Sequence, residues 1–528
     1  MAQVLTESDD VWRGSEHEQQ DAESGGPAGD PPGTDHDGDG GGGAPAGPPG
    51  TAGAHPASGP PSPRRARARW VPALRHRLVS ALAPEEGAAE PVVAGRLTER
   101  EALQVLDALV RMAEALLSCG APAADVTALT LRAAHGAGLA STQVDITFTA
   151  VTVSTAAEER PPLTTVRVVR ARATDYSRLS RLYDLAHAAG DGLDAEEVTA
   201  RLKRVLSQRR RYRRRVSTAA AVGLAVSVAV LLGGGWAVAL AAAATTALIQ
   251  LVLAAANRRG LPAFFQQVAG AAIATAVALL LLVWDPFLPE WVGGLRPSLV
   301  VGSGIVVLLA GLSLVGSAED AISGFYVTAA ARAFETVLLT TGLVIGIAGS
   351  LALGQRAGIG LNLSFSATGG YPLAVEAAAA GCAALTWAVS GYADVRAVVL
   401  SGLVGALAWL TFAATSELGF GALAATGLAA LVVGLLAEGT AWRWGVPGVV
   451  VSICGIVPLL PGLAIYRAIY TLVGGGTSAG LGLLVEALGT ALALAAGVTL
   501  GEFCSQPLRR EFDRVERLVR RRSLSRNF

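Results

Sequence analysis

The residues of this chain best suited to chemistry lie inside long apolar segments. The segment from Gly455 to Gly462 contains Pro458 and Pro461, and Arg467 follows one turn later. Two prolines three residues apart remove helical hydrogen bonds, so this segment is predicted to interrupt a membrane-spanning helix. A broken helix in lipid must face protein or a water-filled cavity, and transporters form binding sites at such breaks. We expect a counterpart of this break in the first half, near Gly316–Gly324. The alternative is a kinked packing helix with Arg467 at the membrane interface.

Acidic residues inside predicted spans are the second group of candidates. Glu376 and Glu486 lie in the sixth and tenth predicted spans, where an ionised carboxylate is costly. A carboxyl group that can take up a proton there suits a proton-coupled carrier, although either residue could instead be the counter-ion of Arg467. Glu319 and Asp320 end the fourth predicted span. They are candidates for a gate or a site, with solvated carboxylates at a helix end as the alternative.

Glu335 is a candidate site residue because it belongs to a spacing pattern that occurs twice in the chain. The spacing G-x10-E-x10-G is found at Gly324, Glu335 and Gly346 and again at Gly475, Glu486 and Gly497. These are the last spans of two halves that meet near Ser364–Gly370, with five predicted spans in each half. Because five is odd, related halves would insert in opposite senses, as in the 5+5 inverted repeats of many carriers. In a chain with 63 glycines the pattern alone does not separate homology from coincidence.

The elements that must position these residues are membrane helices. After the run Arg209–Arg215 the chain stays apolar to Cys504 and contains about ten stretches of roughly 18–22 residues, each long enough to cross a bilayer. We therefore predict a polytopic α-helical membrane protein with an N-terminal α/β domain. The predicted parts are a disordered Gly/Pro-rich tail (1–90), the α/β domain (91–208), two membrane halves (216–363 and 371–505) and a basic tail (506–528).

Arginine placement predicts the orientation. Of the 42 basic residues only Lys203 is a lysine, which indicates a compositional bias rather than a nucleic-acid surface. With ten spans, most arginines fall on the side of the N-terminal domain, and only Arg296 and Arg356 fall on the other side. We expect the chain to cross the plasma membrane several times. The positive-inside rule then predicts that both termini lie in the cytoplasm.

The α/β domain shows helical and alternating patterns. We predict an N-cap at Asp175 and a capping box formed by Asp194 and Glu197. The predicted helices and strands are Leu103–Leu117 with Gly120 just beyond its end, Ala123–His135, a strand over Val144–Ala150, a strand over Thr165–Val169, and two further helices.

Catalytic motifs are not found. Cys119, Asp125, His135 and Asp145 would suit a nucleophile and its bases, but they lack a recognisable motif, and no P-loop is present. The four cysteines have no metal-like spacing. We therefore expect no enzyme activity, no metal and no cofactor. A channel is disfavoured because the chain shows no repeated pore-loop signature.

Several segments resemble the threonine/serine exporter (ThrE) family. The resemblance runs from about Leu103 to Glu502 and rests on Glu114–Val126, Val144–Thr149, Asp175–Leu179, Asp320–Glu335 and Pro458–Arg467. It implies a secondary exporter of threonine and serine driven by protons. In some relatives the two membrane parts are separate polypeptides, and those relatives are associated with dicarboxylate export. The resemblance therefore implies small dicarboxylates as the alternative substrate. Family members are also described as carrying hydrolase-like features in the soluble domain. This implies, as a further alternative, a membrane-anchored hydrolase or regulatory protein that acts through that domain. The expected partners are a small-molecule substrate, protons and the lipid bilayer, with a homo-oligomer left open.

Overall fold

The protein is described from a computed structural model. The described residues are 98–156, 161–170, 174–284, 287, 296–309, 311–359, 371–473 and 476–524, with only the helical backbone beyond Ser505. The expected disordered tail 1–90 and the expected boundary near Ser364–Gly370 lie outside these residues.

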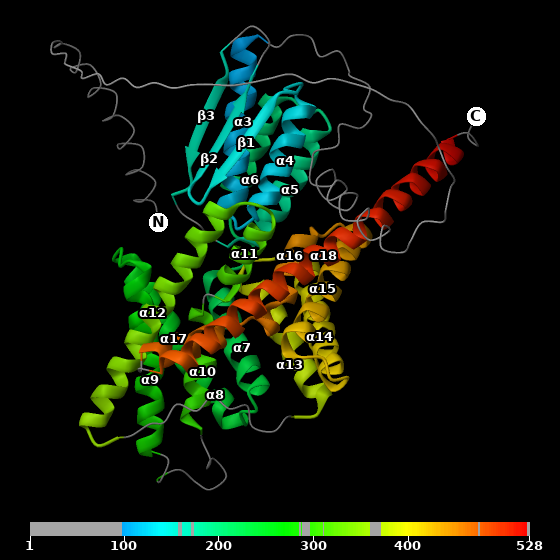
Figure 1. Ribbon diagram of the computed structural model, residues 1–528. Coiled ribbons are helices and arrows are strands. Elements are labelled where there is room, and N and C mark those ends of the chain that lie inside the picture. The colour runs from blue at the N-terminus through cyan, green and yellow to red at the C-terminus, as the bar shows by residue number, and fades with distance from the viewer. Residues whose placement is uncertain are drawn as a thin grey trace, which may run out of the picture. The chain divides into compact units, whose positions relative to one another are not determined.

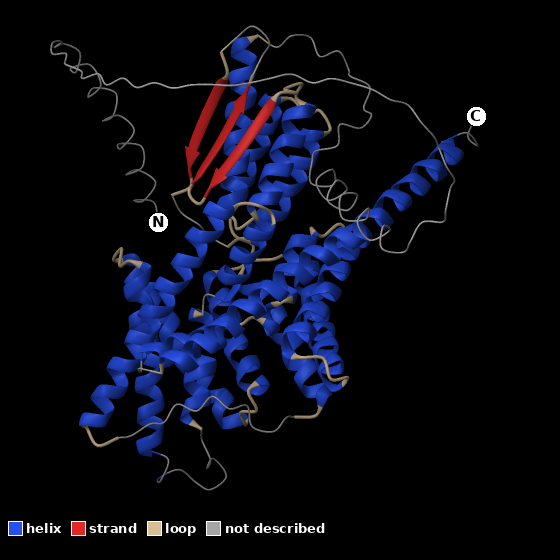
Figure 2. Cartoon of the chain, in the orientation of Figure 1, coloured by secondary structure: helices blue, strands red, loops and turns tan. Residues whose placement is uncertain are grey.

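The N-terminal described part is a small antiparallel sheet covered on one face by helices (Figure 2). The strand order is β1-β2-β3, and β2 alternates buried and half-buried side chains, so one face of the sheet packs inward. Helix α3 packs against β2 and β3, and α4 packs against β1. The elements are α3 (Glu99–Ser118), α4 (Ala123–Gly136), β1 (Thr142–Thr147), β2 (Ala150–Thr155), β3 (Leu163–Val168), α5 (Tyr176–Gly190) and α6 (Ala195–Ser207).

Two local predictions are wrong, each for a physical reason. The strand predicted over Val144–Ala150 is a hairpin, because Thr147 pairs with Ala150 and the chain turns between them. The period-two alternation runs through this turn without a Gly, Asn or Pro to mark it. The capping box at Asp194 is also wrong, because the Asp194 side chain makes no cap hydrogen bond and Glu197 pairs with Arg201 at 2.6 Å.

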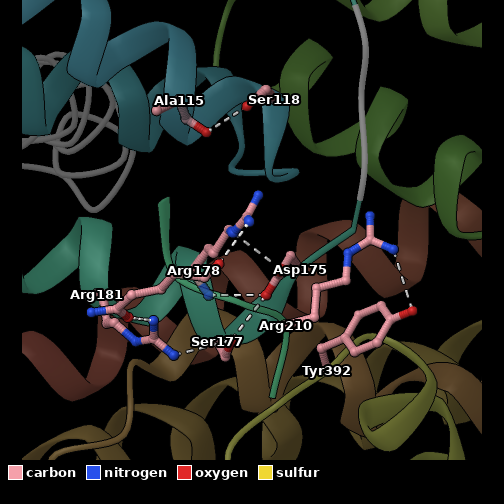
Figure 3. Close-up of polar contacts among 9 residues, drawn as sticks. Ala115, Ser118, Asp175, Ser177, Arg178, Arg181, Arg210 and Tyr392 are labelled. Carbon is pink, nitrogen blue, oxygen red and sulfur yellow. Dashed lines mark hydrogen bonds and ion pairs between the residues drawn. The ribbon is translucent and has the colours of Figure 1, made fainter. Parts of the chain in front are cut away.

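Other helix-end predictions are confirmed. The Asp175 carboxylate accepts the backbone N–H of Arg178 at 3.1 Å, as an N-cap does (Figure 3). Helix α4 begins at Ala123 as predicted, and Gly120 has a φ of 100°, which the turn after α3 requires.

The remainder of the described chain is a helical membrane part (Figure 1). Within the described residues, eight helices are long and apolar enough to cross a bilayer, and two bent helix pairs raise this to ten if each pair is one span. The eight are α7 (Arg214–Leu231), α8 (Trp236–Arg258), α9 (Ala263–Trp284), α12 (Tyr326–Arg356), α13 (Leu373–Ser390), α14 (Val395–Glu417), α15 (Ala422–Trp444) and α18 (Thr477–Leu524). The polytopic prediction is confirmed.

The bent pairs have matching anatomy. In the first pair α10 (Pro297–Gly304), the 3₁₀ turn η2 (Val306–Leu308) and α11 (Gly311–Ile322) have 8, 3 and 12 residues. In the second pair α16 (Gly448–Gly455), η3 (Val457–Leu459) and α17 (Gly462–Val473) have the same three lengths. The pairs bend by 50° and 49°.

Glycine sets the closest helix approaches. A Cβ on Gly346 of α12 would lie 2.3 Å from the carbonyl oxygen of Val268 on α9. A Cβ on Gly497 of α18 would lie 2.3 Å from the carbonyl oxygen of Gly427 on α15. Without a hydrophobic drive between helices in lipid, such backbone contact is the main source of packing energy.

Replacing Gly497 by alanine is expected to separate α18 from α15. The new methyl group meets backbone, which cannot move aside as a side-chain end could, so the loss of stability is expected to be about 1–3 kcal/mol. The measurement is thermal unfolding in detergent. Gly482→Ala on the same helix is the control, because nothing lies within 4 Å of its added Cβ. An equal change in both variants would contradict the packing argument.

Candidate functional site between two broken helices

The break predicted at Pro458 and Pro461 is confirmed. Helix α16 ends at Gly455, Pro458 lies in η3, and Pro461 precedes the first residue of α17, Gly462. Leu460 is extended, with φ −62° and ψ 134°, so the helical hydrogen-bond ladder stops there.

The counterpart break was expected near Gly316–Gly324, and this expectation is wrong. The first bent pair breaks at Leu309, which is extended with φ −70° and ψ 130°, and α11 continues through Gly316. Neither residue that corresponds to the two prolines is a proline, since Val307 and Ala310 stand there. A break without proline leaves only a weak sequence signal, and Gln267 of α9 donates to the freed Leu308 carbonyl at 3.1 Å.

The two breaks touch each other. A Cβ on Gly311 would lie 3.1 Å from the backbone nitrogen of Gly462 and 3.3 Å from the Cβ of Leu460. A Cβ on Gly462 would lie 3.0 Å from the Cβ of Leu309. The broken backbones of two spans about 150 residues apart in sequence therefore meet in the protein interior.

A cavity of about 430 Å³ reaches the first break. It lies between α7, α8, α13 and η2, where Val307 forms part of its wall. Its polar lining includes Thr218, Gln250 and Asn257 of the membrane helices, and Arg210 and Arg214 lie at the end nearest the N-terminal domain. This volume lies in the range of small-molecule sites, and arginines with hydroxyl and amide groups suit a small carboxylate-bearing ligand.

Sequence reasoning missed these lining residues. Gln250 and Thr218 are polar groups in otherwise apolar helices, a signal that could have been used. Arg210 and Arg214 were interpreted only as topological anchors. Trp387, Ser390, Gly391 and Tyr392 complete one wall, but they come from the second membrane half, and their approach depends on the tertiary structure.

Arg467 and Glu486 are brought together. Arg467 is partly buried on α17, and Glu486 on α18 is the acidic group whose charge acts on it. Glu486 itself is exposed, as is Glu335 on α12. Glu376 lies in the first turn of α13, where its carboxylate accepts the indole N–H of Trp409 at 3.2 Å.

Asp320 is buried rather than solvated, with 1% of its surface exposed. Its carboxylate pairs with Arg332 of α12 at 3.0 Å and accepts the backbone N–H of Ala123 at the start of α4 at 3.3 Å. Glu319 is partly buried beside Asp320 and close enough to Asp125 of α4 for their charges to interact. The solvated-carboxylate alternative is therefore wrong for Asp320.

Acidic side chains of the N-terminal domain and of the membrane helices lie close enough for their charges to interact. The Tyr183 hydroxyl donates to the Asp125 carboxylate. Burial raises the pKa of Tyr183 well above its usual value, and the carboxyl groups of Asp125, Glu319 and Glu502 raise it further. Burial also raises the pKa of Asp125, which the Tyr183 hydrogen bond partly offsets.

The residues considered for hydrolysis do not form a nucleophilic site. Cys119 is buried, and burial together with the Asp175 carboxylate raises the pKa of its thiol to about 11. A thiol with such a pKa is a poor nucleophile at neutral pH. His135 and Asp145 are exposed on α4 and β1.

The raised pKa of Asp125 predicts a pH dependence of stability. The folded protein holds this proton more tightly than the unfolded chain, so the contribution is present below the ordinary Asp pKa and is lost as the pH rises through the raised pKa. Thermal stability is expected to rise as the pH falls through the raised pKa toward the ordinary Asp value, and to rise less in Asp125→Asn. Asp191→Asn, at an exposed carboxylate, is the control. Equal slopes for Asp125→Asn and the unmodified protein would contradict this.

Comparisons with known proteins cover both membrane halves. Residues 107–354 match a family model described as putative threonine/serine exporter, and residues 376–504 match one described as threonine/serine exporter, ThrE. The chain is 39% identical over 436 residues to a probable threonine/serine exporter of Mycobacterium tuberculosis, with 81% of each chain covered. It is 35% identical over 412 residues to a threonine/serine exporter of Corynebacterium glutamicum, covering 77% of this chain and 83% of that one. No solved structure matches the chain.

Proposed function

Because the chain belongs to the threonine/serine exporter family, we propose that this multi-pass membrane protein exports threonine, serine or a similar small hydroxy amino acid. The observation that carries the proposal is the contact between the two broken spans at Gly311 and Gly462, beside a cavity of suitable size. Broken helices that meet between two halves are the usual position of a carrier's substrate site.

An inverted repeat of five spans each is part of this proposal. The starts of α7, α8 and α9 recur 159 residues later as the starts of α13, α14 and α15, and the starts of α10, α11 and α12 recur 151 residues later. The pattern with Glu335 and Glu486 has the same spacing of 151 residues. Gly346 and Gly497 also make equivalent close contacts, each with its own half.

Hydrogen bonds at both ends of α7 and α13 support opposite insertion of the two halves. Ser217 near the start of α7 donates to the carbonyl of Ser390 at the end of α13, at 2.9 Å. Tyr371, just before α13, donates to the carbonyl of Gly234, just after α7, at 3.2 Å. The proposed equivalents α7 and α13 therefore run antiparallel, which supports an inverted repeat.

The cytoplasmic position of the N-terminal domain is supported by the arginines at span ends. The ends of α8 and α15 that carry Arg258 and Arg443 lie on the same side of the ten-span topology as the connector Arg209–Arg215 and the start of α14. Arg296 and Arg356 lie at the opposite ends. This distribution favours the domain side as the cytoplasmic side, with both termini there.

For recognition, the substrate carboxylate is proposed to bind near Arg210 and Arg214, and its hydroxyl group near Gln250 and Asn257. For proton coupling, the proposed groups are Arg467 with Glu486, and the buried Asp320 with its partly buried neighbour Glu319. Glu335 and Glu376 remain candidates on the same argument, since each is a carboxyl group inside a span.

Small dicarboxylates are the second candidate substrate. Among the described residues, the cavity lining includes two arginines and no acidic side chain, which favours an anion over the ammonium group of an amino acid. The lining therefore favours small dicarboxylates as the second candidate substrate, and a flux measurement with threonine and with a dicarboxylate separates the two.

Efflux from proteoliposomes decides between these functions. Vesicles preloaded with labelled threonine are expected to lose it faster when a pH gradient is imposed than without one, because proton binding would be coupled to release. Labelled succinate is the comparison substrate. Equal threonine flux with and without the gradient would remove proton coupling, and flux of succinate alone would replace the leading substrate by the dicarboxylate.

The cavity assignment predicts different effects of two adjacent arginines. Arg214→Gln is expected to raise the KM for efflux by about tenfold, because one charge-assisted hydrogen bond to the substrate carboxylate is lost. Arg215→Gln removes the same charge from the same connector but does not line the cavity. It therefore controls for changes in topology or folding. If both variants raise KM equally, the cavity is not the carboxylate site.

A further inference from the structure

The N-terminal domain makes contacts with both membrane halves. On the first half its contacts are with α11 and α12. Asp320 of α11 accepts the N–H of Ala123 at the start of α4, and Thr328 of α12 donates to the carbonyl of Ile146 in β1 at 3.1 Å. Both membrane side chains are buried, so these bonds are shielded from water.

On the second half the contact is with the end of α13 and the α13–α14 loop, and it centres on Tyr176, the first residue of α5. Its backbone N–H donates to the carbonyl of Gly391 at 2.8 Å, and its hydroxyl accepts the indole N–H of Trp387 at 3.1 Å. Tyr176 is only 2% exposed. Its ring fills the space above Gly391, where a Cβ would lie 2.4 Å from a ring carbon.

The connector to the first span adds contacts to the same loop. The Arg210 guanidinium lies over the Tyr392 ring, 4.9 Å from its centre, and donates to its hydroxyl at 3.4 Å (Figure 3). Arg211 pairs with Asp394. Tyr392 has a φ of 63°, whereas the equivalent position of the first half, 159 residues earlier, is Gly233 with φ 79°. A tyrosine in this strained conformation indicates that its side chain is needed at this position.

The two contact sites are connected rigidly through α4 and α5. Helix α4 supplies Ala123 to the first half, and α5 supplies Tyr176 to the second half. The two helices pack so closely that a Cβ on Gly136 would lie 2.6 Å from the carbonyl oxygens of Ala189 and Gly190. The hydrogen bond from Tyr183 to Asp125 joins them again near the membrane.

We propose that the α4–α5 pair is a strut that holds the domain-side ends of the two membrane halves at a fixed separation and so favours the arrangement of the halves seen in this structure. The proposal rests on the proposed function in one respect, since alternating access requires one half to move against the other. A rigid body bonded to both halves cannot follow that motion, so one of its two contacts must break when the halves move.

Distance measurements between the halves test the strut. Spin labels are placed at Leu261→Cys, after α8, and at Trp444→Cys, the end of α15, which are exposed at the domain-side ends of the two halves. The exposed Cys382 and Cys504 are replaced by alanine. Electron–electron double resonance on the full chain in liposomes then gives the distribution of separations.

Two variants weaken the strut from opposite ends. Gly391→Ala keeps an allowed backbone, with φ −85°, but drives a methyl group into the Tyr176 ring. Thr328→Val removes the hydrogen bond to β1. In each, the fraction of molecules with a shorter separation is expected to rise about fivefold to tenfold.

Matched controls carry the same chemical changes without touching the domain. Gly421→Ala adds a Cβ with nothing within 4 Å. Thr340→Val lies on α12 like Thr328, is 3% exposed, and loses only a bond to its own helix at Thr336. Both controls are expected to keep the separation of the parent protein.

Unchanged distributions in both test variants would overturn the strut, and so would a shift in only one of them, because a strut fails when either end is released. Labelled threonine efflux is measured on the same parent vesicles. If the parent shows no flux but the test variants shift the distances, the proposed function fails and the strut stands. If the parent shows flux and the distances do not shift, the strut fails and the proposed function stands.

Discussion

The contact between the two helix breaks is the constraint on which the membrane part depends. A broken helix exposes unpaired backbone groups, which hydrocarbon cannot satisfy, so the break must be enclosed by protein. Here each break is covered by the other, with Gly311 against Gly462 and Leu309 beside Gly462. A side chain at either glycine would separate the backbones. The two halves are therefore held together at the place where each would be least stable alone.

Small residues extend this constraint to the rest of the bundle. At Gly346 and Gly497 two helices approach until a Cβ would meet a carbonyl oxygen, and each contact lies within one half. Dispersion contacts of this kind replace the hydrophobic effect, which is absent between helices in lipid. The halves also contact each other, since α7 packs along α13 and α11 packs against α18. The N-terminal domain bonds to both halves at one end.

The sequence predicted the break at Pro458 and Pro461 but misplaced its counterpart, because the first break has Val307 and Ala310 in place of the prolines. It identified Asp320 as a candidate without its buried partner Arg332, and it named Arg467 and Glu486 without showing that they are neighbours. Glu376 was grouped with them, whereas its carboxylate contacts Trp409. In each case the residue type was visible in the sequence, and the partner was not.

The sequence by itself determined that the chain is a polytopic helical membrane protein, and it located the proline-containing break. The physical reason is that these properties are local: about 20 apolar residues cross a bilayer, and two prolines interrupt a helix wherever they stand. Arginines near span ends likewise predict an orientation from the sequence alone. Only the tertiary structure decided where the breaks meet, which side chains line the cavity and how the N-terminal domain reaches both halves. Those features join residues that are far apart in sequence, such as Ala123 with Asp320, 197 positions apart, and Tyr176 with Trp387, 211 positions apart, and packing alone brings them together.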